Sequence, residues 1–145
     1  MRFKKHSKTT EYPGVMRPSI PSVQEGLTGI VKGKKASDIE ERFAIALDRF
    51  GIGYSFQRYV PTEYTLPDQE KQVDFIVFYR ERAYPVEIYG LYWHDGADEI
   101  RRDQERERQL NDVFESWGWE KLQIVWEREL FDQQAAYAKV SWMFT

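Results

Sequence analysis

The stretch from Val73 to His94, VDFIVFYRERAYPVEIYGLYWH, limits what this chain can fold into more than any other part of it. It contains two runs rich in Val, Ile, Phe and Tyr, residues 73–79 and 84–92, separated by the polar triplet Arg80-Glu81-Arg82. Runs of this composition are typical of strands near the centre of a sheet. The stretch therefore predicts a β-hairpin around which the other elements are organised.

Each predicted strand carries one carboxylate, Asp74 in the first and Glu87 in the second. A tight turn about Arg80 and Glu81 sets Asp74 opposite Glu87, with Cβ atoms roughly 5 Å apart. Facing like charges on a buried sheet are destabilising unless a positive group compensates them. Two interpretations are open: a divalent cation held by both acids, or acids that are solvated or paired with Arg or Lys from a neighbouring element. If the charges clash, replacing either acid should leave the melting temperature unchanged or higher.

Composition excludes several classes of protein. The chain of 145 residues has no Cys, so disulfides, thiolate metal sites and a catalytic Cys are impossible. It has no apolar run of about 18 residues and no signal-peptide pattern, so we expect a soluble protein of the cytosol.

Charge is distributed unevenly along the chain. Residues 1–36 hold eight basic and two acidic residues, a net of +6, while the whole chain carries -3. This segment lacks periodicity and is interrupted by Pro and Gly, so we predict an extended N-terminal arm ahead of a domain at 37–145. A basic arm is typical of proteins that bind nucleic acid, and its candidate DNA-binding residues are Lys4, Lys5, Lys8, Lys32, Lys34 and Lys35.

Periodicity predicts the remaining elements. We expect helices at 37–50, 98–117 and 129–140, and further strands at 54–60 and 121–126. Leu130, Ala135, Tyr137 and Ala138 are the candidates for burial by the last helix. Together with the hairpin they give the order α-β-β-β-α-β-α, an α/β fold with a mixed sheet covered by helices.

Two further residues have both a structural and a functional interpretation. Glu40 stands three residues after Ser37, which fits a capping box, but its carboxylate also shares a face with Leu47 and could point along the sheet. His94 follows the second strand, where it is either an exposed loop residue or a general acid or base beside the carboxylate pair. The run RRDQERER, residues 101–108, is more typical of a solvated helix face than of a site.

The order and spacing of these motifs resemble the PD-(D/E)XK nuclease superfamily. The residues concerned are Glu40, Gln57, Val-Asp-Phe at 73–75, Val-Glu-Ile-Tyr-Gly at 86–90, Tyr-Trp-His at 92–94 and Ile-Val-Trp-Glu at 124–127. The branch they are most similar to comprises very-short-patch repair endonucleases and related phage and mobile-element nucleases. The resemblance covers about residues 35–132 and implies a restriction-endonuclease-like core.

The resemblance implies a metal-dependent DNA endonuclease in which Mg²⁺ or Mn²⁺ is bound by Asp74, Glu87 and the backbone carbonyl of Ile88. It further implies that Glu40 joins the metal through water and that His94 assists proton transfer. The superfamily's Glu-x-Lys has Tyr89 in place of the Lys. An alternative is therefore a catalytically silent subunit that binds nucleic acid, or forms a homodimer or larger assembly through its arm. Cytoplasm of a bacterium or of a phage-infected host is the expected location.

Overall fold

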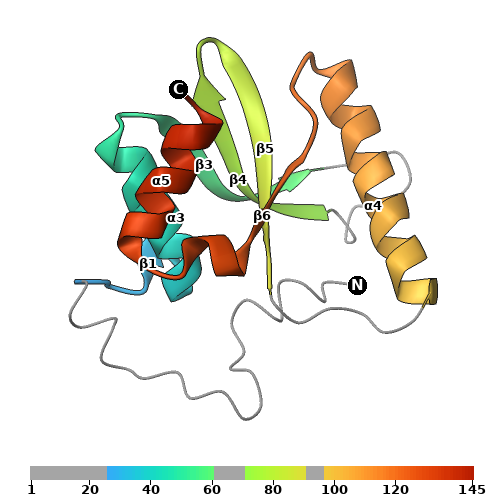
Figure 1. The fold of residues 1–145 in the computed structure, drawn as a ribbon. Helices are drawn as coiled ribbons and strands as arrows, with labels where there is room; N and C mark the ends of the chain where they lie inside the picture. The colour runs from blue at the N-terminus through green and yellow to red at the C-terminus, as the bar shows by residue number, and fades with distance from the viewer. Residues whose placement is uncertain (1–25, 61–70, 91–96) are drawn as a thin grey trace. The chain divides into compact units, whose positions relative to one another are not determined.

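The computed structural model describes residues 26–60, 71–90 and 97–145 (Figure 1). The described chain begins with a small hairpin and continues with three α-helices, four further strands and a 3-10 helix. In chain order these are β1 (Ile30–Val31), β2 (Lys34–Lys35), α3 (Asp38–Arg49), β3 (Gly53–Val60), β4 (Lys71–Tyr79), β5 (Arg82–Tyr89), α4 (Ala97–Ser116), β6 (Gln123–Trp126), η2 (Glu127–Leu130) and α5 (Gln133–Met143). Strands β3 to β6 form a sheet in the order β3-β4-β5-β6. The predicted α/β class and element order are confirmed.

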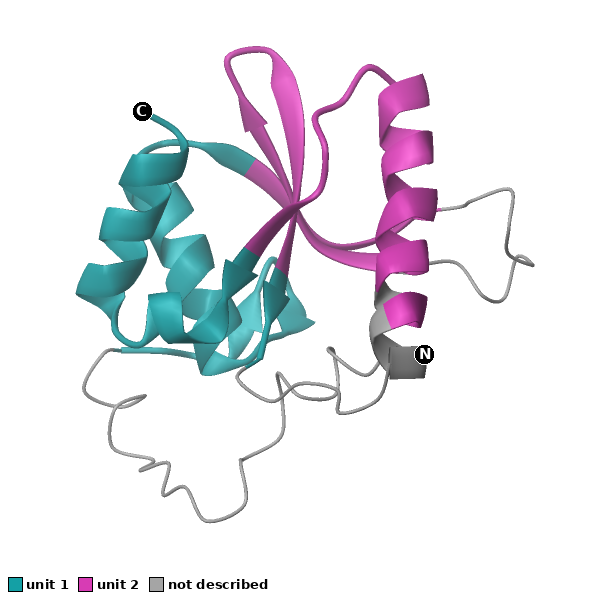
Figure 2. Ribbon diagram, turned by 45° about the vertical axis from the view of Figure 1, so that its right-hand side comes forward, with its two compact units in different colours: residues 1–53, 88–92, 125–145 teal, residues 54–87, 93–124 magenta. Residues whose placement is uncertain are grey.

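The chain divides into two compact units, drawn in different colours in Figure 2. Unit 1 comprises residues 1–53, 88–92 and 125–145, and unit 2 comprises residues 54–87 and 93–124. Strands β5 and β6 each begin in unit 2 and end in unit 1. The two carboxylates of the central hairpin both belong to unit 2.

The central hairpin has the predicted register. Strands β4 and β5 are antiparallel, and the pairs run from Tyr79 with Arg82 to Phe75 with Val86. The turn residues Arg80 and Glu81 have φ values of 50° and 66°, as a tight two-residue hairpin turn requires at both central positions. Continued by one residue, this register places Asp74 opposite Glu87.

Helix α4 covers the hairpin within unit 2. Its residues Leu110 and Phe114 are fully buried in a cluster with Val73, Ile76 and Ala83 of the two strands. Glu120 N–H donates to the carbonyl of Ala83 at 2.9 Å, which fixes the segment that follows the helix. On the opposite strand face, the ring of Phe75 contacts the rings of Phe56 and Tyr54 of β3, with centroids 5.0 and 5.7 Å away.

Helices α3 and α5 pack together within unit 1. Arg42 of α3 donates to the carbonyl of Leu130 at 3.1 Å, and Gln133 of α5 donates to the carbonyl of Arg42 at 2.9 Å. The predicted last helix is confirmed as α5, but its bounds differ: η2 ends at Leu130, and Asp132 caps α5 by accepting the Ala135 N–H, so the helix begins at Gln133.

This break changes the buried face of the last helix. Leu130 is buried as predicted, but Ala136, Val140 and Phe144 fill the core. The predicted Ala135 and Tyr137 are only half-buried, and Ala138 is exposed. Ala136, Val140 and Phe144 are four residues apart, so they lie along one side of the last helix.

Residues 26–36 differ from the predicted extended arm. They form the hairpin β1–β2, with Ile30 paired to Lys35 and Val31 to Lys34. Val31 is 4% exposed, so it anchors the hairpin in the core. Residues 1–25 of the predicted arm lie outside the described residues.

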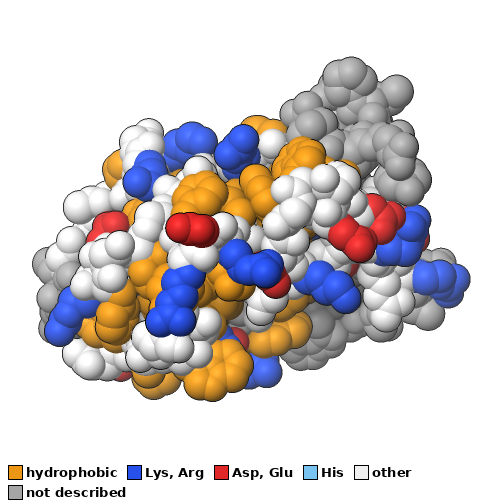
Figure 3. Space-filling model, turned by 90° about the horizontal axis from the view of Figure 1, so that it is seen from above, with side chains coloured by type: hydrophobic (Ala, Val, Ile, Leu, Met, Phe, Trp, Pro, Cys, Tyr) orange, Lys and Arg blue, Asp and Glu red, His pale blue; other side chains and the backbone are white. Residues whose placement is uncertain are grey.

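Several large hydrophobic side chains remain exposed, among them Tyr59, Phe131 and Trp142. Figure 3 shows hydrophobic side chains on one face between those of Lys and Arg. Among the helices that the structure describes, none combines the length and apolar character needed to cross a membrane.

Candidate functional site

The two carboxylates of the central hairpin are completely buried. Asp74 and Glu87 both have 0% exposure. Alternate residues of a strand share a face, so Asp74 lies on the face of Ile76 and Glu87 on the face of Ala83. Arg106 of α4 bonds Glu87, and the register places Asp74 opposite Glu87 on the same face, so both acids lie on the side of the hairpin that this helix covers.

Arg106 of α4 compensates this buried charge. Its Nη1 donates to Oε1 of Glu87 at 2.9 Å, and its Nη2 donates to the carbonyl of Gln72 at 2.9 Å. The Arg106 side chain is 5% exposed. One guanidinium therefore links both strands of the hairpin to the helix, with charge-assisted bonds of the strong kind.

The position of Arg106 follows from helical spacing. Arg106, Leu110 and Phe114 are four residues apart and thus lie along one face of α4. Leu110 and Phe114 bury this face, and the long aliphatic stem of Arg106 continues it while the guanidinium reaches Glu87. The expectation that residues 101–108 form a solvated face is therefore wrong for Arg106. The sequence interpretation gave this residue too little weight.

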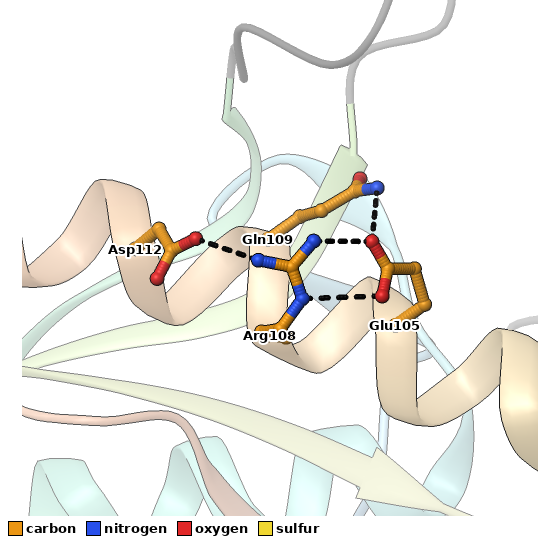
Figure 4. A network of polar contacts seen from close by, with 4 residues as sticks. All are labelled: Glu105, Arg108, Gln109 and Asp112. Carbon is orange, nitrogen blue, oxygen red and sulfur yellow. Dashed lines mark hydrogen bonds and ion pairs between the residues drawn. The ribbon is translucent and has the colours of Figure 1, made fainter.

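Other charged residues of the same run behave as predicted. Arg108 donates to Glu105 and, at 3.1 Å, to Asp112, while Gln109 donates to Glu105 at 3.2 Å (Figure 4). These contacts lie along the surface of α4, and the side chains of Glu105 and Arg108 are half exposed. The hydrogen bond from Arg108 holds the pKa of Glu105 below its usual range.

Glu40 takes the structural role that its spacing predicts. Its carboxylate accepts the Ser37 N–H at 2.9 Å, and its own N–H donates to the Ser37 hydroxyl at 3.1 Å, which confirms the capping box. The residue is 2% exposed. It belongs to unit 1, whereas Asp74 and Glu87 belong to unit 2. Its role as a metal ligand through water stays a prediction.

Tyr89 occupies the position that the resemblance assigns to a Lys. Its ring meets the ring of Trp126 edge-on, with centroids 5.3 Å apart. The guanidinium of Arg128 lies 5.2 Å from the centre of the same Trp126 ring. An aromatic contact thus stands where the superfamily motif provides an ammonium group.

The remaining predicted residues are placed only in part. Ile88 is completely buried, and Lys32, Lys34 and Lys35 have exposed side chains in the β1–β2 hairpin. His94, Lys4, Lys5 and Lys8 lie outside the described residues. Their functional roles stay predictions.

The donor chemistry of the carboxylate pair fits a hard divalent cation. Mg²⁺ is commonly held by one or two carboxylates together with water and phosphate oxygens, and a carboxylate that bonds Arg106 through one oxygen can coordinate through the other. Among the side chains that the structure describes, no cluster of three or more His, Asp or Glu is arranged to hold a metal.

Comparison with known proteins gives structural likenesses only. No family model and no curated protein matches the chain. A solved structure described as the catalytic domain of the homing endonuclease I-Bth0305I superposes with a TM-score of 0.47 and 19% identity, covering 73% of this chain and 92% of that one. A protein of unknown function, AF1548, superposes with a TM-score of 0.41 and 14% identity, covering 61% of this chain and 46% of that one. Likenesses this distant leave the function to be argued from the residues of the chain itself.

Proposed function

We propose that the chain is a metal-dependent endonuclease that hydrolyses phosphodiester bonds in DNA. The observation that carries this proposal is the register of the β4–β5 hairpin, which sets the carboxylates of Asp74 and Glu87 opposite each other on one face. Two neighbouring carboxylates are a donor set that suits Mg²⁺, which is usually held by one or two carboxylates with water and phosphate oxygens.

The residues of the proposed site have three different roles. Asp74 and Glu87, with the carbonyl of Ile88, would hold Mg²⁺ or Mn²⁺, which supplies Lewis-acid activation of the phosphate and of a bound water. Arg106 fixes the orientation of the Glu87 carboxylate, as hydrogen-bonding partners of metal ligands commonly do. His94 is the candidate for moving a proton to or from the reacting oxygens, because an imidazole titrates near neutral pH.

DNA is the proposed substrate because the segment 1–36 carries a net charge of +6. Lysines that neutralise phosphates release bound counterions and so raise affinity. Lys4, Lys5 and Lys8 are candidates for such contacts.

A second candidate is a catalytically silent subunit that binds nucleic acid. Three observations favour it: both carboxylates are completely buried, Arg106 already neutralises Glu87, and Tyr89 packs on Trp126 where a catalytic Lys would stand. In this case the Glu87–Arg106 pair is structural, and the arm contributes binding or assembly.

Cleavage of supercoiled plasmid in Mg²⁺ or Mn²⁺ decides between the two. The wild-type chain should nick or linearise the plasmid, and EDTA should stop the reaction. Asp74→Asn should abolish cleavage because it removes a charged metal ligand. Asp112→Asn is the matched control, since Asp112 is an exposed acid of α4 and the same charge is removed.

The outcomes separate clearly. Loss of cleavage in Asp74→Asn with retention in Asp112→Asn supports the endonuclease. Equal cleavage by wild type and Asp74→Asn contradicts the proposed site. Absence of cleavage by the wild type in both metals, with DNA binding intact, supports the silent subunit.

A further inference from the structure

The β1–β2 hairpin is held on helix α3 by one buried carboxylate. Glu41 is 5% exposed. The Thr28 N–H donates to both of its oxygens at 3.0 Å, the Gly29 N–H donates at 2.8 Å, and the Thr28 hydroxyl donates at 2.9 Å. Bonds from backbone N–H groups to a carboxylate are charge-assisted and strong. The start of the hairpin is therefore fixed in unit 1.

The hairpin itself is closed and tightly turned. Ala36 N–H donates to the carbonyl of Gly29 at 2.8 Å, and Lys32 and Gly33 have φ values of 49° and 79°. Positive φ at both central residues is the geometry of a two-residue hairpin turn whose twist matches its strands. Together with the buried Val31, these contacts give the tip a defined position.

The tip of this fixed hairpin is basic. Lys32, Lys34 and Lys35 lie within four residues, and all three side chains are exposed. The turn is thus a compact cationic projection whose base is anchored by Glu41 and Val31. A rigid cluster of cations loses less conformational entropy on binding a polyanion than cations on an extended chain do.

We propose that the β1–β2 hairpin is a preorganised contact for the phosphate backbone of duplex DNA and that Glu41 is its positioning residue. This inference rests on the proposed DNA substrate, but it concerns binding and is independent of cleavage. It assigns part of the basic N-terminal segment to the folded body of the protein, separately from residues 1–25.

The first test compares DNA binding of two charge-matched variants. Anisotropy of a short fluorescent duplex is measured in EDTA, which prevents metal-dependent cleavage. The variant Lys32→Ala/Lys34→Ala/Lys35→Ala should lower the slope of log affinity against log salt by about 2 to 3 units, from roughly 0.9 per phosphate contact. Between about 50 and about 200 mM salt, the difference in affinity between this variant and wild type should shrink by about 16- to 60-fold. The control is Arg58→Ala/Arg80→Ala/Lys121→Ala, three exposed cations of unit 2.

The second test uses the sign of a charge effect. Glu41→Gln removes one negative charge, so charge alone predicts tighter binding to DNA. If Glu41 positions the lysines, binding weakens instead, and the amides of Thr28 and Gly29 exchange faster with solvent. Asp48→Asn is the matched control, because Asp48 is an exposed acid of the same helix. It should bind as wild type does or slightly more tightly.

An unchanged salt slope in the triple lysine variant overturns the DNA contact, as does an equal loss in the unit 2 control. Binding by Glu41→Gln that is as tight as that of Asp48→Asn overturns the positioning role. If Glu41→Gln fails to fold, the triple lysine variant still decides the contact, since its side chains are outside the core. A protein that binds with the expected slope but never cleaves retains this inference while losing the proposed catalysis.

Discussion

Replacing Arg106 with Met should be among the most destabilising single changes in unit 2. The substitution keeps much of the aliphatic stem beneath α4 but removes the guanidinium that bonds Glu87 and the Gln72 carbonyl. Glu87 is then left beside Asp74 on a buried face without this cation. The sequence alone suggested a like-charge clash, and the ion pair changes the expected effect of removing either partner.

The magnitude follows from burial. The side chains of Arg106 and Glu87 are 5% and 0% exposed, and removing one partner of such a pair typically costs about 3–5 kcal/mol. Domains of ordinary size have a free energy of unfolding of about 5–15 kcal/mol. For a chain of about this length, 1 kcal/mol shifts the melting temperature by about 2–4 °C, so we expect a fall of about 6–20 °C.

Urea unfolding of a double-mutant cycle measures the interaction itself. The variants are Arg106→Met, Glu87→Gln and the two combined. The double variant should recover part of the loss, with a coupling free energy of about 2 kcal/mol or more, because no isolated charge of the pair remains. Arg108→Met is the control on the same helix. Its ion pairs are about half exposed, so it should cost less than about 1 kcal/mol.

A coupling free energy below about 0.5 kcal/mol would refute the reasoning, as would a loss of stability in Arg108→Met equal to that in Arg106→Met.

Replacing Asp74 and replacing Glu87 should affect stability differently. Glu87→Ala should destabilise, since it leaves Arg106 buried without its acid. Asp74→Ala should still leave the melting temperature unchanged or raise it, because it removes one of two facing negative charges.

Two further changes test the caps and the surface of unit 1. Ser37→Ala removes the hydroxyl of the α3 capping box and should cost about 1 kcal/mol in urea unfolding; a cost equal to that of the exposed Ser116→Ala would contradict the role of the cap. Burial raises the pKa of Glu129, but hydrogen bonds from Lys139 and the Trp126 N–H outweigh it and hold that pKa below 4.5. The stabilisation is therefore present above about pH 4.5 and is lost as the pH falls through the lowered folded value, so thermal melts of wild type and Glu129→Gln should differ at pH 7 and converge in acid.

Much of the fold could be predicted because local chemistry and the global arrangement agree. The triplet Arg80-Glu81-Arg82 separates two strands with one consistent alternation, so a tight turn fixed the register. Ser37 and Glu40 identified the start of α3 because a capping box satisfies backbone groups within four residues. Features of this kind depend on neighbours in sequence, which a single chain displays directly.

The hairpin at 26–36 could not be predicted in the same way. Its strands have two residues each, too few to show an alternation. What holds it is the distant carboxylate of Glu41, a residue that the sequence presents as one of several acids in the first turn of α3. Lys32 also has a positive φ, which is uncommon for a residue with a side chain. Neither a contact between residues distant in sequence nor an unfavourable local conformation can be inferred from the residues that neighbour the hairpin in sequence.

The burial of Arg106 was not predicted, for a related reason, and it bears on the proposed site. Hydrophobic periodicity treats every charged residue as a mark of the solvent face, yet Arg106 lies one turn before Leu110 on the buried face of α4. A buried cation at such a position requires a buried anion, and the central hairpin offers Asp74 and Glu87. The Arg106 contact to Glu87 makes these acids chemically distinct: one is oriented by a guanidinium, and the other is the acid whose removal should spare stability. Asp74 is therefore the residue at which a loss of cleavage would report on chemistry, whereas a loss in Glu87 variants would mix chemistry with folding.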